Sequence, residues 1–229
     1  MNAVADSLGR IRERIAAATA RRGPGPAVTL IGVAKHQPVE AVRAALDAGL
    51  VDVGENYAQE LQRKQEALGA RGRWHFIGGL QSNKVKLVVG RALIHTVDRP
   101  SLIAAIAGRA RGLGVVQDVL LEVNLGGEAQ KAGAEPAAVD GLLDAIAGEG
   151  GAVVCRGLMA IPPPDTPERT RPHFAALREL AARLAPRPHC ELRELSMGMS
   201  ADFEVAIEEG ATLVRVGTAL FGERPASRP

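Results

Sequence analysis

The stretch VTLIGVAKHQP (28–38) decides between the α/β folds that the chain could adopt. Its first seven residues form a β-type apolar run, as expected for a strand that is covered on both faces. In an open doubly wound sheet, the loop after the first strand carries a glycine-rich phosphate-binding fingerprint. Here Lys35-His36-Gln37-Pro38 follows the run and contains no glycine. This argues against the doubly wound fold.

Outward from this run, short β-type segments alternate with longer helical patterns. The predicted strands are 28–34, 51–54, 74–78, 93–97, 118–124, 153–161, 192–198 and 212–217. The predicted helices are 38–48, 56–68, 81–89, 100–112, 135–147, 167–184 and 200–209. This alternation indicates parallel strands joined by crossover helices, and about eight such strands close a barrel. We therefore predict an α/β fold, the (β/α)8 TIM barrel.

The first residues form an additional element outside the strand and helix alternation. Apolar residues recur at helical spacing over 1–22, and the Gly/Pro cluster at 23–26 ends this amphipathic helix. Barrels of about 200–250 residues commonly fold as one domain. We therefore expect a single domain over 1–229, with the barrel at 27–222 and a tail at 223–229.

Composition excludes several classes of partner. Lys and Arg total 28 against 26 Asp and Glu, and the basic residues are scattered, so no footprint for nucleic acid or anionic membranes exists. The N-terminal helix carries charges between its apolar positions, unlike a signal peptide or a membrane span. Cys155 and Cys190 have neither metal-ligand nor disulfide-framework spacing. We expect a cytoplasmic protein with reduced thiols and no metal.

Polar residues follow the predicted strands, where barrel proteins place their functional groups. The loops after the last two strands often bind phosphate. Ser200 is placed to cap the helix 200–209, Gly217 lets the backbone approach an anion, and Thr218 offers a hydroxyl group. Each residue alone is equally well explained as a cap or a turn. Their pairing in both expected loops favours a phosphate site.

Lys35 has competing interpretations. A lysine that leaves a buried strand is often a rim residue whose stem covers apolar surface. Burial at the end of a barrel strand instead favours the neutral amine, which attacks carbonyl groups. An aldehyde cofactor with a phosphate would suit both Lys35 and the phosphate loops. A rim residue, a cofactor Schiff base and a cofactor-free aldolase lysine all stay open on residue chemistry alone.

Three further residues lie on or near the predicted strands. Two of them, Arg215 and Met199, have both a structural and a cofactor-binding interpretation, and the third, His75, has a structural interpretation. Arg215 either pairs with Glu194 or Asp202, or lies against the phosphate or ring nitrogen of a cofactor. Met199 is either a packing residue or a cover for a cofactor. His75, within a predicted strand, is interpreted as a hydrogen-bonded strand residue.

Four segments together resemble one known family. They are GVAKHQP (32–38), DVGENYAQEL (52–61), WHFIGGLQSNKV (74–85) and LSMGMSADFEVAIEEGATLVRVGTALFG (195–222). The chain resembles, over nearly its whole length, the YggS/PROSC-type pyridoxal phosphate homeostasis proteins, which are related to the N-terminal barrel of alanine racemase. Ala34 and His36 depart from the commoner Ser and Thr beside the lysine.

The resemblance implies a barrel of the PLP fold type III kind that holds pyridoxal 5'-phosphate (PLP). It implies a Schiff base on Lys35, Asn56 approaching the cofactor, and a phosphate held by Ser200, Gly217 and Thr218. The cofactor-binding residues expected in full are Lys35, Asn56, Met199, Ser200, Arg215, Gly217 and Thr218.

The resemblance also implies a role in intracellular PLP (vitamin B6) and amino-acid homeostasis. We expect a monomeric PLP carrier with PLP-dependent apoenzymes as partners and no catalytic residues. The alternative is a PLP-dependent amino-acid racemase-like enzyme. Alanine racemase, however, takes a catalytic tyrosine from a second domain, whereas the one tyrosine of this sequence is Tyr57, after the second predicted strand.

We expect negligible racemisation of L-alanine to D-alanine, because Lys35 is the one candidate base at the predicted site. The measurement is chiral analysis of alanine after incubation with the PLP-loaded protein. Sustained turnover in the common enzymatic range of about 1–10³ s⁻¹ would contradict the carrier function.

Overall fold

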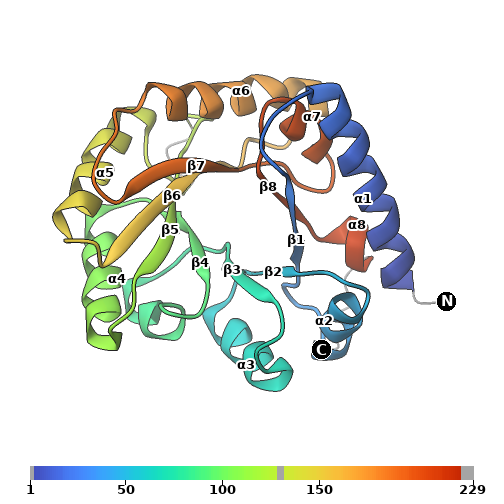
Figure 1. The fold of residues 1–229 in the computed structure, drawn as a ribbon, viewed down its shortest axis with the longest axis horizontal. Helices are drawn as coiled ribbons and strands as arrows, with labels where there is room; N and C mark the ends of the chain where they lie inside the picture. The colour runs from blue at the N-terminus through green and yellow to red at the C-terminus, as the bar shows by residue number, and fades with distance from the viewer. Residues whose placement is uncertain (1–2, 128–131, 223–229) are drawn as a thin grey trace.

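The computed structural model describes residues 3–127 and 132–222, and within them eight parallel strands close a barrel. Each strand pairs with the next along the chain, and the last pairs with the first (Figure 1). The strands are β1 Thr29–Val33, β2 Asp52–Glu55, β3 Arg73–Phe76, β4 Leu93–Val97, β5 Gln117–Glu122, β6 Val153–Met159, β7 Cys190–Ser196 and β8 Leu213–Val216. The predicted (β/α)8 barrel is confirmed.

The helices surround the barrel, and all except α1 follow a strand in the chain (Figure 1). They are α1 Ala3–Arg22, α2 Val39–Asp47, α3 Ala58–Leu68, α4 Pro100–Leu113, α5 Val139–Gly148, α6 Pro167–Arg183, α7 Phe203–Glu208 and α8 Thr218–Phe221, with 3₁₀ segments η1 Ser82–Leu87 and η2 Pro136–Ala138. The predicted helical segment 81–89 forms as the shorter 3₁₀ segment η1, with i→i+3 bonds such as Lys84 N–H to Gln81 O (2.9 Å).

The N-terminal helix α1 lies on the outside of the barrel against α7 and α8 (Figure 1). Leu8, Ile11 and Ala18 are its buried residues, which confirms the amphipathic pattern. Residues 1–2 of the predicted helix and the predicted tail 223–229 lie outside the described residues. Across the described ranges, no helix combines the length and the apolar character that a membrane crossing requires.

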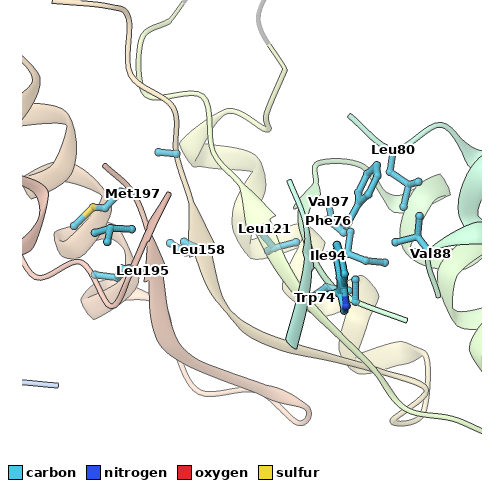
Figure 2. Close-up of a cluster of buried hydrophobic side chains, with 14 of the residues drawn as sticks. Trp74, Phe76, Leu80, Val88, Ile94, Val97, Leu121, Leu158, Leu195 and Met197 are labelled. Carbon is cyan, nitrogen blue, oxygen red and sulfur yellow. The ribbon is translucent and has the colours of Figure 1, made fainter. Parts of the chain in front are cut away.

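Buried apolar side chains form two separate layers. The larger layer lies between the strands and the helices, and Figure 2 shows part of it, where Phe76 and Leu80 lie near Val88. A smaller cluster from four strands fills the barrel interior: Ile31, Leu120, Met159 and Leu213. Full burial of one such side chain contributes about 1.5–3 kcal/mol. The small inner cluster leaves part of the barrel interior to polar side chains.

The strand register brings the carboxyl ends of β8, β1 and β2 side by side. Gly32 of β1 lies beside Val216 of β8, and Val33 lies beside Gly54 of β2. The Ala34 N–H continues the ladder by donating to the Gly54 carbonyl at 2.8 Å. The residues that directly follow these three strands therefore share one end of the barrel, which we call the barrel mouth.

Candidate functional site

Lys35 lies at the barrel mouth, two residues beyond the end of β1. Its side chain is half-buried, and it forms no hydrogen bond or ion pair with any described residue. An amine without a protein partner at a barrel mouth is available to a ligand. This position is compatible with the predicted covalent role and also with a solvated rim lysine whose stem covers apolar surface.

Asn56 follows β2 at the same end. Its backbone N–H donates to Glu55 Oε2 at 3.1 Å. Its side-chain Oδ1 is buried and has no hydrogen-bond partner in the described part of the chain. A buried acceptor without a partner costs about 1–3 kcal/mol, so this atom calls for a donor from outside the protein. Asn56 thus offers an unused hydrogen-bond acceptor at the barrel mouth.

Ser200 does not cap the helix that follows it, contrary to the prediction. α7 begins only at Phe203, after a turn, and Asp202 occupies the cap position, where its Oδ1 accepts from the Met199 N–H at 2.7 Å. Ser200 Oγ instead accepts from the Gly217 N–H (3.3 Å) and the Ala219 N–H (3.5 Å). The hydroxyl therefore joins the loop after β7 to the loop after β8.

Gly217 and Thr218 lie where β8 passes into α8. Gly217 is the N-cap residue of α8 and has a φ of −108°, so its backbone conformation does not itself require glycine. A Cβ atom there would meet Val33 at 3.4 Å, an ordinary contact. Thr218 is exposed, and Met199, in the facing loop, is 39% exposed and so is not a core packing residue. These residues border the mouth near Lys35.

Arg215 is buried inside the barrel at 4% exposure. Its guanidinium group donates to Ser196 Oγ (2.6 Å) and to the Ala160 carbonyl (3.0 Å). It forms no ion pair with Glu194 or Asp202, both of which the structure describes, so the alternative that paired it with them is wrong. Burial lowers the pKa of Arg215 to about 10.

Glu122 at the end of β5 is buried, and its charge, like that of Asp202, favours the charged form of Arg215. Burial, with a smaller contribution from the charge of Asp98, raises the pKa of Glu122 to about 7 against the opposing effect of Arg215. The barrel thus holds a buried carboxyl group that is partly protonated near neutral pH and that interacts electrostatically with Arg215. The sequence reasoning did not single out Glu122.

Two buried histidines extend the contacts of Arg215 through the barrel. His95 Nδ1 lies 2.9 Å from Ser196 Oγ, and His95 Nε2 lies 3.0 Å from His75 Nδ1. His75 Nε2 lies 2.8 Å from Asp52 Oδ1. The expectation that His75 is a hydrogen-bonded strand residue is confirmed. The chain Arg215–Ser196–His95–His75–Asp52 crosses from β8 and β7 to β2.

The directions of the two outer hydrogen bonds follow from the two ends of this chain. Arginine only donates and a carboxylate only accepts, so Ser196 Oγ accepts from Arg215, and Asp52 accepts from His75. Burial lowers the pKa of His95 well below its usual value, with the charges of His75 and Arg215 adding to the effect. Burial alone would raise the pKa of Asp52, but hydrogen bonds from His75 and Arg73 outweigh it and lower that pKa.

The sequence carries a weak signal for this network. His75 and His95 stand in the short apolar runs WHFIG and LIHTV of neighbouring strands. A histidine in each of two adjacent buried strands suggests that the two side chains share the barrel interior. The pairing with Ser196, a hundred residues further along the chain, becomes visible only in the closed barrel.

Comparison with known proteins shows to which family this barrel belongs. The family model described as "Alanine racemase, N-terminal domain" matches residues 7–225. The chain belongs to the alanine racemase N-terminal domain family. The pyridoxal phosphate homeostasis protein of Aquifex aeolicus is 49% identical over 228 residues, which are 98% of this chain and 99% of that protein. That of Escherichia coli K12 is 40% identical over 239 residues, covering 100% of both. The resemblance to these proteins is confirmed.

Solved structures agree with the fold. PipY of Synechococcus elongatus with PLP bound has a TM-score of 0.83 and 38% identity, covering 96% of this chain and 100% of that one. Alanine racemase of Bartonella henselae has a TM-score of 0.72 at 13% identity, and the match covers 99% of this chain and 60% of the enzyme. The latter comparison shows a shared fold alone.

Proposed function

We propose that the protein binds PLP at the barrel mouth and serves intracellular PLP (vitamin B6) and amino-acid homeostasis. The observation that carries the proposal is the buried, unpartnered Oδ1 of Asn56. This residue directly follows β2, the neighbour of the strand that leads into Lys35, whose amine has no described partner. The names of the relatives and the PLP-bound structure of PipY support it.

Each proposed cofactor contact uses a different chemical group of this chain. Lys35 Nζ would attack the aldehyde carbon, and the resulting carbon–nitrogen double bond forms with loss of one water molecule. The Ser200 and Thr218 hydroxyls and the backbone N–H of Gly217 suit a phosphate, which accepts hydrogen bonds. Arg215 and Met199 complete the proposed set. When bound, PLP supplies the aldehyde that this Schiff base requires.

Replacement of Ser200 or Thr218 by alanine is expected to weaken PLP binding by about tenfold or more. A hydrogen bond to a charged group contributes about 1.5–3 kcal/mol, and each 1.4 kcal/mol corresponds to a tenfold change in Kd. The measurement is a PLP titration followed by absorbance, together with thermal unfolding. Ser101→Ala, at an exposed position of α4, is the control. Unchanged affinity with a lower Tm would show that the two residues only shape the loops.

The carrier function has a direct test. We propose that the protein acts as a single-domain monomer in the cytoplasm and passes PLP to apoenzymes; the half-buried position of Lys35 supports access by a recipient. PLP-loaded protein is mixed with an apo-aminotransferase in the presence of a phosphatase that removes free PLP. Recovery of aminotransferase activity is expected, and its absence would contradict direct transfer. Sedimentation analysis tests the monomer.

A further inference from the structure

A second lysine, Lys64, is completely buried behind the ends of β1 and β2. Its ammonium group donates to the Ala34 carbonyl at 2.6 Å, to Glu60 Oε2 at 3.1 Å and to Glu55 Oε1. A lysine ammonium has three donors, so all three are used. Lys64 is therefore fully engaged and is not a rival amine for an aldehyde.

Two acceptors of Lys64, Ala34 and Glu55, directly precede proposed cofactor residues, and the third, Glu60, contacts the residue after Lys35. Ala34 directly precedes Lys35 in the chain. Glu60 Oε2 also accepts from the backbone N–H of His36, the residue after Lys35, at 3.2 Å. One buried ammonium thus holds the main chain on both sides of Lys35, directly on one side and through Glu60 on the other.

The same cluster holds Asn56. The carboxylate of Glu55 accepts from Lys64 through Oε1 and from the Asn56 backbone N–H through Oε2, at 3.1 Å for the latter. Glu55 and Lys64 are both fully buried. The residue with the unpartnered amide oxygen and the residue with the free amine are therefore tied to one ion pair.

The backbone beside Lys35 needs such support. His36 has a φ of +61°, in the left-handed region that residues other than glycine rarely adopt. A residue in a sparsely populated backbone region costs on the order of 1–3 kcal/mol and keeps that conformation only when its surroundings impose it. Glu60 contacts His36 twice, through the backbone N–H and through the ring, where Nδ1 lies 3.6 Å from Oε1.

Stability alone gives a poor account of this ion pair. Burial raises the pKa of Glu55 and Lys64 opposes the shift, which reflects the cost of placing the carboxylate in the interior. Replacement of a buried ion pair by neutral residues of similar volume is often neutral or stabilising. A positioning role is supported by the backbone groups that the cluster binds. Lys64 binds the Ala34 carbonyl, Glu60 binds the His36 N–H, and Glu55 binds the Asn56 N–H.

We propose that Lys64, with Glu55 and Glu60, is a positioning cluster that holds the Lys35 amine and the Asn56 amide in register toward the same aldehyde ligand. The inference rests on the proposed function, because it assigns the residues that prepare that site. None of the three cluster residues needs to touch the ligand.

The first test separates positioning from binding. The double variant Lys64→Met/Glu55→Gln removes both buried charges together, so that neither is left unpaired. Its rate of Schiff-base formation with PLP, followed in the visible region, is expected to fall by about 100-fold, the cost of a misplacement of about 1 Å. Affinity for pyridoxine 5'-phosphate, which has the phosphate but no aldehyde, is expected to stay within about threefold, a change of under 1 kcal/mol.

Lys86→Met is the matched control, because Lys86 is exposed in η1 and outside the cluster. This variant should form the Schiff base at the wild-type rate. A double variant that loses affinity for both ligands together with its Tm would overturn the proposal in favour of a structural role. A double variant with the wild-type rate would overturn it as well.

A milder pair of variants keeps the buried Lys64–Glu55 contact. Glu60, whose side chain is 22% exposed, is replaced by alanine, which releases the His36 N–H, or by glutamine, whose oxygen still accepts from it. Glu60→Ala is expected to slow Schiff-base formation by about tenfold, and Glu60→Gln to restore most of the rate. Equal rates in both variants and the wild type would contradict the role of Glu60.

The two proposals fail in distinguishable ways. If the wild-type protein forms no borohydride-trapped product with PLP, the proposed function fails and the positioning role falls with it. If the wild-type product forms normally and the cluster variants match its rate, only the positioning role is overturned.

Discussion

Lys35→Ala is expected to abolish the pyridoxyl product that borohydride traps, while the protein keeps its fold. Because the Lys35 side chain forms no hydrogen bond or ion pair with a described residue, its removal breaks no such contact. The measurements are the visible absorbance of the PLP complex, mass spectrometry after reduction, and thermal unfolding. Weak residual binding is expected, since the proposed phosphate contacts are separate from the aldehyde.

The other lysines test whether Lys35 is the residue that forms the trapped product. Lys64 is buried with three acceptors, Lys84 and Lys86 lie in η1, and Lys131 lies outside the described residues. Lys84→Ala should retain the trapped product. Peptide mapping decides the assignment: a pyridoxyl group on any lysine other than Lys35 in the wild-type protein would show that the covalent site has been misplaced.

Gly78→Ala is expected to reduce both stability and PLP affinity strongly. A Cβ atom at position 78 would lie 2.1 Å from the Asn56 carbonyl oxygen and 2.8 Å from its carbonyl carbon. Backbone atoms cannot rotate away, so the loop that carries Asn56 must move. Overpacking of this kind typically costs about 1–3 kcal/mol of folding free energy. A displaced Asn56 should weaken PLP binding by about tenfold or more.

The neighbouring glycine is the matched control. A Cβ atom at Gly79 would meet no described heavy atom within 4 Å, so Gly79→Ala should change neither property. Thermal unfolding and PLP titration of both variants test the contrast. Equal behaviour of the two variants would show that the close approach of Gly78 to Asn56 is not maintained in solution.

The architecture was accessible from the sequence because barrel strands are short, apolar and separated by amphipathic helices. The predicted strand 93–97 has the same limits as β4, and most other boundaries differ by one or two residues. The apolar pattern did not determine the type of helix at 81–89. This segment forms the 3₁₀ segment η1, and apolar spacing does not distinguish i→i+3 from i→i+4 hydrogen bonding.

The sequence predicted only part of the candidate site, because local patterns do not show which distant side chains meet. Residues that directly follow strands, such as Lys35 and Asn56, could be assigned to one mouth, because all parallel strands end on the same side. The N-cap interpretation of Ser200 is wrong, because α7 begins only at Phe203, whereas its phosphate role stays a proposal. Its actual partners, Gly217 and Ala219, are seventeen or more residues away and meet it only when β7 and β8 pair.

The sequence by itself determined the strand order, the barrel class and the lysine at the end of β1, since these depend on the order of local apolar patterns along the chain. Only the tertiary structure decided which polar groups meet. The contacts of Lys64 with Ala34 and of His95 with Ser196 join distant segments inside a closed barrel, where a buried charge or imidazole must find a partner. Pairings of this kind depend on barrel closure and side-chain direction, which apolar periodicity does not encode.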